Sequence, residues 1–155
     1  MATGTISELW RYPVKSMRGE RVDRSGVTES GLLGDRAYAV VDVESGRVCS
    51  AKHPRLWGPL LHCEARYRVE PAPPDAAEPA PVAIALPDGT ETGSDDPDVE
   101  ARLSRLLGRR VSLASVAPEG NSYLAVWPDG VAPADFVAGT AVGDAAAEGE
   151  GTLTE

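Results

Sequence analysis

The sequence contains few cysteines and no long apolar run. Its 155 residues include two cysteines, Cys49 and Cys63, which are too few for a disulfide framework, so both are predicted to be free thiols. No stretch approaches the roughly 18 apolar residues that a membrane-spanning helix needs, and residues 1–20 lack the apolar core of a secretory signal. These absences predict a cytoplasmic protein that does not bind membranes.

Positive charge is scarce in the second half of the chain. Residues 1–70 hold 11 basic and 9 acidic side chains, whereas residues 71–155 hold 4 and 15, and no Lys or Arg follows Arg110. The formal net charge of −9 argues against generic binding to nucleic acids or anionic membranes. If an anionic ligand binds, we expect it to bind the first half.

The common catalytic and metal-binding motifs are also absent, including phosphate loops, dinucleotide fingerprints and paired Cys-x-x-Cys ligands. Composition alone would allow a zinc site built from Cys49, His53, His62 and Cys63. However, His62 and Cys63 are consecutive in a predicted strand, so their side chains would point to opposite faces. We therefore predict no metal ligand, two buried thiols, and no catalytic nucleophile or general base.

Glycine and proline, by contrast, are abundant, with 16 and 13 copies. They favour short strands and turns over a helical bundle. Alternating or β-branched segments predict strands at residues 4–12, 21–27, 37–43, 47–51, 60–70, 82–86 and 111–116. Those before residue 71 are expected to form a β-meander. The predicted fold is α+β and mainly β: a small antiparallel barrel or strongly curved sheet with one packed helix.

That helix is predicted over about residues 97–107. Asp96 can cap its first turn, Pro97 suits a position whose N–H needs no partner, and Gly108 offers a left-handed stop. An apolar stripe at helical spacing is formed by Val99, Leu103, Leu106 and Leu107. We expect this stripe to pack on the sheet.

The chain reads as one domain with a tail. Residues 71–81 contain five prolines and are predicted to form a surface loop. Residues 138–155 consist mostly of Ala, Gly, Thr and acidic residues, with little to bury. We therefore assign residues 1–137 to the domain and residues 138–155 to an acidic tail or linker.

Two segments of the first half suit anion binding. After an aromatic strand and Pro13, the chain presents Lys15 and Ser16 in one bend, where a cation, a hydroxyl and backbone N–H groups can meet a phosphate. Arg36 enters a buried strand after two glycines, and its planar fork suits a phosphate or carboxylate. Alternatively, Lys15 and Arg36 are ordinary charges at strand ends, with Asp35 as the surface partner of Arg36.

The sequences LWRYPVKSMRGE, GLLGDRAYAVVD and SAKHPRL, in this order and spacing, resemble the N-terminal β-barrel domain of the MOSC proteins. This family includes molybdenum cofactor sulfurase, the mitochondrial amidoxime reducing component and bacterial iron–sulfur MOSC proteins. The resemblance is dense over residues 5–60 and extends through the predicted helix. It implies that Lys15, Ser16 and Arg36 help hold the phosphate and pterin of the molybdenum cofactor, molybdopterin.

The resemblance also implies a second domain. The cysteine that ligates molybdenum in this family lies in the C-terminal MOSC domain, which would begin where this chain ends, at Glu155. Cys49 and Cys63 match no ligand of the family. We therefore expect this chain to need a MOSC domain, in cis or in trans, to retain the cofactor.

By itself the chain is not expected to catalyse a reaction. The assembled protein would be an oxidoreductase acting on N-oxygenated or related substrates, or a sulfur-carrier type protein, with a ferredoxin-like or flavin-dependent electron donor. Two alternatives remain open. In the first, the chain is a free-standing β-barrel module for a phosphorylated small molecule. In the second, it is a non-catalytic interaction half of a split or truncated protein.

Overall fold

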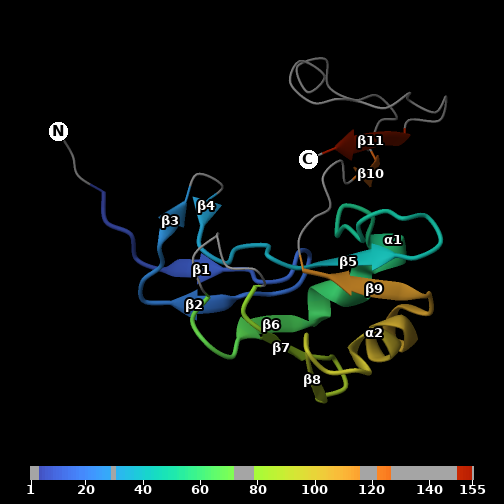
Figure 1. Ribbon diagram of the computed structural model, residues 1–155. Coiled ribbons are helices and arrows are strands. Elements are labelled where there is room, and N and C mark those ends of the chain that lie inside the picture. Colours follow the sequence, from blue (N-terminus) through green and yellow to red (C-terminus); the bar gives the residue numbers. More distant parts are fainter. Residues whose placement is uncertain (1–3, 29–30, 72–78, 116–121, 127–149, 155) are drawn as a thin grey trace.

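The computed structural model describes residues 4–28, 31–71, 79–115, 122–126 and 150–154 (Figure 1). The helices of this part are short: α1 (Pro54–Trp57), the 3-10 helix η1 (Gly58–His62) and α2 (Val99–Leu107). The strands are β1 (Leu9–Arg11), β2 (Glu20–Val22), β3 (Val27–Thr28), β4 (Gly31–Leu32), β5 (Ala39–Asp42), β6 (Glu64–Tyr67), β7 (Val82–Ala85), β8 (Glu91–Gly93), β9 (Val111–Ala114), β10 (Ser122–Val126) and β11 (Glu150–Thr154). The fold is therefore mainly β, as predicted.

Small antiparallel sheets take the place of the expected barrel or single curved sheet. The described strands pair as β1–β2, β3–β4, β5–β9, β10–β11 and the three-stranded β6–β7–β8. Isolated parallel bridges at Val14–Tyr38 and Arg18–Glu64 connect three of these sheets. Within the described part of the chain no barrel closes: the strands are two to five residues long, and Pro13 lacks the N–H needed to extend β1 as a paired strand.

The buried strand expected at residues 37–43 is β5, which pairs with β9 (Figure 1). Val40 is fully buried and lies opposite Leu113. The predicted order of pairing was wrong here, since β9 follows β5 by about seventy residues of sequence and a meander pairs neighbours. The expected return arm at residues 47–51 contributes one bridge, between Val41 and Val48. A sequential meander does occur in β6–β7–β8.

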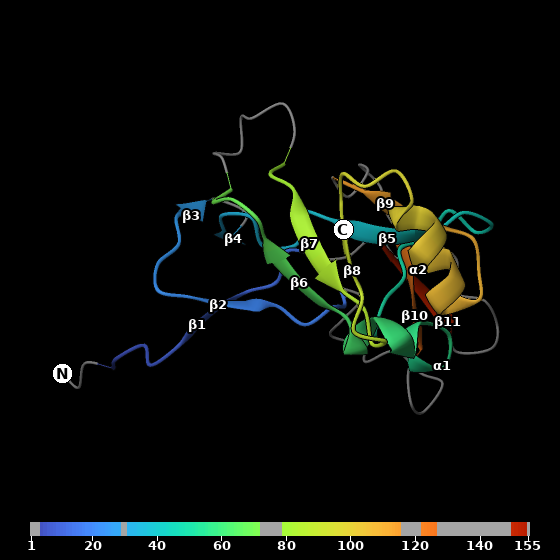
Figure 2. The same cartoon turned by 90° about the horizontal axis from the view of Figure 1, so that it is seen from below.

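Helix α2 confirms the helix predicted at residues 97–107. Gly108 ends it with φ of 64°, as expected of a left-handed stop. Asp96, however, does not cap it: the structure places the N-cap at Asp98, and the Asp96 carboxylate accepts hydrogen bonds from Gly93 N–H and the Thr92 hydroxyl. In Figure 2, α2 lies beside the β5–β9 pair.

The strand predicted at residues 60–70 was too long. Residues 54–62 form α1 and η1, two short helical turns that the sequence analysis did not identify, and β6 begins at Glu64. Pro54 and Pro59 explain the difference, since proline fixes a φ suited to the start of a helical turn and cannot donate to a sheet.

An apolar cluster packs the central elements of the described chain together. It joins β5, β6, β7, β9, α2 and the turn around residue 14, and its fully buried aliphatic members are Val14, Val40, Leu60, Val82, Ile84 and Leu103. Within the expected tail, β11 pairs with β10. The domain boundary at residue 137 lies outside the described residues and stays a prediction, as does most of the proline-rich loop, at residues 72–78.

Candidate functional site

The stretch that follows β1 lies parallel to the stretch that precedes β5. Three backbone hydrogen bonds join them, from Arg36 to Tyr12, from Tyr38 to Pro13 and from Lys15 to Tyr38, at 2.7, 3.0 and 2.9 Å. Because Pro13 has no N–H, its carbonyl carries the pairing at that point. The fold thus places the backbone of Lys15 and Ser16 alongside the segment that begins at Arg36.

Ser16 and Arg36 both have left-handed backbone conformations, with φ of 68° and 52°. Every other described residue with positive φ is a glycine. A side chain in this region costs roughly 1–3 kcal/mol, and such residues gather at functional sites, where the surrounding structure holds them. Two of the three residues predicted to hold an anion therefore occupy strained backbone positions.

A third segment joins this site through Ser16. Its Oγ accepts a hydrogen bond from Ala51 N–H at 2.9 Å, so the turn at residues 50–53 lies against the Ser16 bend. The exposed Lys52 belongs to this turn. Residue-by-residue reasoning did not place the turn at the site, although SAKHPRL was one of the three sequences that carried the family resemblance.

Asp35 steadies the turn that carries Arg36. Its Oδ1 accepts Tyr12 N–H at 2.8 Å, and its Oδ2 accepts Arg36 Nη1 at 3.1 Å. This is the surface pairing that the sequence analysis kept as an alternative. The Arg36 side chain is 63% exposed, and an exposed ion pair of this kind contributes little to stability. The guanidinium can therefore still reach an anion. Binding by Lys15, Ser16 and Arg36 stays a prediction.

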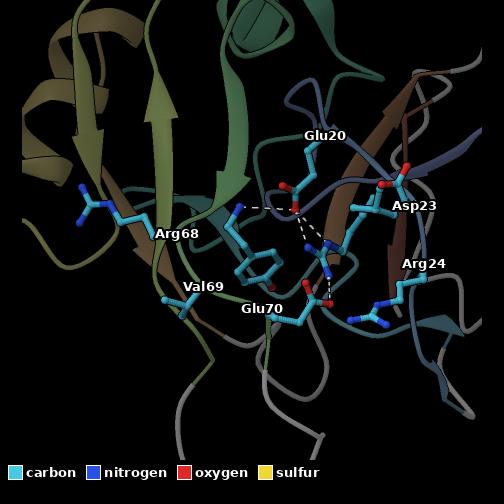
Figure 3. A pocket seen from close by; sticks show the side chains of 9 residues that line it. Glu20, Asp23, Arg24, Arg68, Val69 and Glu70 are labelled. Carbon is cyan, nitrogen blue, oxygen red and sulfur yellow. Dashed lines mark hydrogen bonds and ion pairs between the residues drawn. The ribbon is translucent and has the colours of Figure 1, made fainter.

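A pocket of about 320 Å³ lies beside the β1–β2 hairpin (Figure 3). Arg11, only 2% exposed, lines it between two carboxylates: Glu20 Oε1 accepts Nε at 2.9 Å and Glu70 Oε1 accepts Nη1 at 3.1 Å. The guanidinium carbon stands 4.7 Å from the centre of the Tyr67 ring. We call these four residues the Arg11 cluster.

Sequence reasoning missed the Arg11 cluster. A signal was present in the alternation of β1, where Trp10 and Tyr12 are exposed while Arg11 takes the inward-facing position between them. An arginine at an inward position needs partners for its charge. Those partners lie at Glu20, Tyr67 and Glu70, too far along the chain for the local pattern to identify.

The cysteines are free and buried, as predicted. Burial raises the pKa of the Cys49 thiol to about 12 and that of Cys63 to about 11, so neither is a thiolate at neutral pH. The argument against zinc assumed that His62 and Cys63 share a strand, which was wrong, because His62 ends η1. Across the described ranges, no three His, Cys, Asp or Glu side chains gather as metal ligands.

We find no helix in the described segments that is long and apolar enough to cross a membrane. Comparison with known proteins is more informative. The family model described as the MOSC N-terminal beta barrel domain matches residues 3–109. No solved structure gives a significant match.

Curated relatives match part of the chain. The mouse and human mitochondrial amidoxime-reducing component 1 proteins are each 38% identical to it over 65 residues, which cover 39% of this chain and 19% of each relative. The rat mitochondrial amidoxime reducing component 2 is 33% identical over 88 residues, covering 54% of this chain and 25% of that protein. The matched region thus spans about a fifth to a quarter of these relatives.

Proposed function

Because the chain belongs to the MOSC N-terminal beta barrel domain family, a family of molybdenum cofactor proteins, we propose that it helps hold the phosphate and pterin of that cofactor. The observation that carries the proposal is the pair of strained residues, Ser16 and Arg36, on backbone stretches that lie side by side. Lys15 adds a second cation to this set.

The donors suit an anion with several oxygens. The Ser16 hydroxyl oxygen already accepts Ala51 N–H, so its own O–H can donate to a ligand. The Arg36 fork and the Lys15 ammonium add charge-assisted hydrogen bonds. Residues 1–70, which hold this set, have more basic than acidic side chains, and this balance favours an anionic ligand.

In this proposal the chain binds and orients, and we assign no catalytic residue to it. A bound molybdenum cofactor would supply the redox-active metal. A C-terminal MOSC domain, in cis or in trans, would complete the site and supply the metal ligand. The assembled protein would reduce N-oxygenated or related substrates with electrons from a ferredoxin-like or flavin-dependent donor. The amidoxime-reducing names of the relatives support this. A cytoplasmic location stays part of the proposal.

Metal analysis after gel filtration tests whether the chain needs a MOSC domain to retain molybdenum. The 155-residue chain alone should retain no stoichiometric molybdenum and show no reductase activity. Joined to a downstream MOSC domain, or mixed with one, it should form a species that retains the cofactor. One molybdenum bound per isolated chain would show that the chain suffices by itself and would contradict the proposal.

Matched arginine variants test the site within the joined protein. Arg36→Gln should lower molybdenum content, because the fork that meets the phosphate is lost. Arg105→Gln removes the same charge from the exposed side of α2 and should leave the content unchanged. Equal molybdenum in both variants would remove Arg36 from the site.

A further inference from the structure

The turn that carries Arg36 rests on the side chain of Tyr67. The Tyr67 hydroxyl donates to the Gly34 carbonyl at 2.9 Å. Gly34 has φ of 78°, and a Cβ placed there would lie 2.9 Å from the Tyr67 hydroxyl oxygen and 2.8 Å from Pro71 Cγ. Only glycine fits so close an approach at this φ. Tyr67 therefore fixes the start of the turn.

Tyr67 is itself held by two other members of the Arg11 cluster. Arg11 stands over its ring, and Glu20 Oε1 accepts both the Arg11 guanidinium and, at 3.4 Å, Tyr67 N–H. Figure 3 shows the dashed lines that converge on the Glu20 carboxylate beside the pocket. Burial raises the pKa of Tyr67 to about 12, so its hydroxyl keeps the proton that it donates to Gly34.

The other end of the turn is held by Tyr12, the residue after Arg11. Tyr12 N–H donates to Asp35 and its carbonyl accepts Arg36 N–H. The turn is thus held at Gly34 through Tyr67 and at Arg36 through Tyr12. Arg11 contacts Tyr67 and precedes Tyr12 in the sequence. A buried ion pair is seldom more stabilising than apolar packing of the same volume. The stability of the fold therefore does not by itself explain why an arginine, and not an apolar residue, lies at position 11.

We propose that Arg11 and Tyr67 are positioning residues: they hold the turn at residues 34–36 so that Arg36 keeps its left-handed conformation and faces the ligand. The ligand part of this inference rests on the proposed function. The conformational part depends only on contacts within the chain.

The test uses Tyr67→Phe, which keeps the ring over Arg11 and deletes the hydroxyl. Native-state hydrogen exchange of the Arg36 amide, followed by NMR, reports the stability of the turn without any ligand. Loss of one hydrogen bond should speed it by roughly 2- to 10-fold relative to the Leu103 amide of α2 in the same sample. A loss of global stability speeds exchange through global unfolding equally at both amides and leaves that ratio unchanged. Ser104→Ala deletes a hydroxyl bonded to Val111 at the other side of the fold and should not raise the ratio.

Titration with inorganic phosphate supplies the second readout. Phosphate should shift the amides of Lys15, Ser16 and Arg36 in the parent, and Tyr67→Phe should weaken that binding by roughly 2- to 10-fold while Ser104→Ala does not. An Arg36-to-Leu103 exchange ratio that Tyr67→Phe leaves at the parent value would overturn the positioning role. A parent chain whose site amides do not respond to phosphate would count against the proposed function instead, with the exchange ratio still deciding the positioning role.

Discussion

Among the residues that the structure describes, two clusters place an arginine over an aromatic ring between two carboxylates, and they differ in how well the arginine is paired. In the Arg11 cluster every ion-pair contact is 3.1 Å or shorter. In the second, Arg109 lies 5.6 Å from the centre of the Trp57 ring, and its contacts to Asp42 and Glu44 are 3.4 and 3.3 Å. We call this second group the Arg109 cluster.

The two clusters also differ in whether their buried polar atoms have hydrogen-bond partners. Arg109 Nε and Asp42 Oδ1 are buried without a hydrogen-bond partner in the part of the chain that the structure describes. Arg11 is 2% exposed and Arg109 is 37% exposed. Similar side chains thus form a tight cluster next to the candidate site and a loose one at the end of α2. Of the two clusters, the more closely paired one lies where the backbone must hold a strained arginine, Arg36.

Removing each arginine tests this comparison most directly. Arg11→Met should lower the free energy of unfolding by about 3 kcal/mol, because Glu20 is left partly buried without its cation. Arg109→Met should cost about half as much or less, since its contacts are long and Ser45 still binds Asp42. Urea denaturation of both variants measures the difference. Equal losses would mean that the contact distances do not reflect the strength of pairing.

Acid should weaken the Arg109 cluster. Burial would raise the pKa of the Asp42 carboxyl, but hydrogen bonds from Ser45 and Arg109 outweigh it and hold that pKa below the ordinary 3.8. A carboxyl with a lowered folded pKa stabilises the fold above its unfolded pKa, and this contribution is lost as the pH falls through the folded value. Asp42→Asn should therefore lose less stability than the parent between pH 5 and pH 2.

Urea denaturation at each pH follows this difference. If the free energy of unfolding of Asp42→Asn falls with acid as steeply as that of the parent, Asp42 is not the group responsible for the acid sensitivity.

Local signals in the sequence predicted some features at both ends of the molecule. Helix α2 could be placed because its apolar stripe and Gly108 are local signals. The residue types of Lys15, Ser16 and Arg36 indicated an anion site, and the backbone does bring their segments together. Neither the β5–β9 pairing nor the burial of Arg11 was predictable, because both depend on partners distant in sequence, and no local pattern encodes that register.

Each cluster lies near a residue with a left-handed backbone conformation, Arg36 or Gly108. Substitutions at these two positions should change the free energy of unfolding in opposite directions. Arg36→Gly should raise the free energy of unfolding by about 1 kcal/mol, since glycine relieves the strain and only an exposed ion pair is lost. Gly108→Ala should lower it by about 1 kcal/mol, because the space around it is open and the positive φ alone opposes a Cβ. Thermal denaturation measures both. An Arg36→Gly variant less stable than the parent would show that the side chain stabilises its own turn.

The smallest expected effect on stability belongs to Arg36→Lys, which separates binding from folding. Lysine keeps the charge, and the ion pair that it alters is exposed, so the free energy of unfolding should change by less than about 0.5 kcal/mol. Affinity for inorganic phosphate should nevertheless fall by roughly 2- to 10-fold, the equivalent of one hydrogen bond, because an ammonium cannot offer two parallel N–H donors. Binding by parent and variant should weaken as ionic strength rises, since both rely on opposite charges. Titration at two salt concentrations, with Arg105→Lys on α2 as the matched control, measures these effects. If Arg36→Lys binds phosphate as tightly as the parent, Arg36 contributes only its charge to binding. The Arg11 cluster would then hold a turn whose planar guanidinium is not needed.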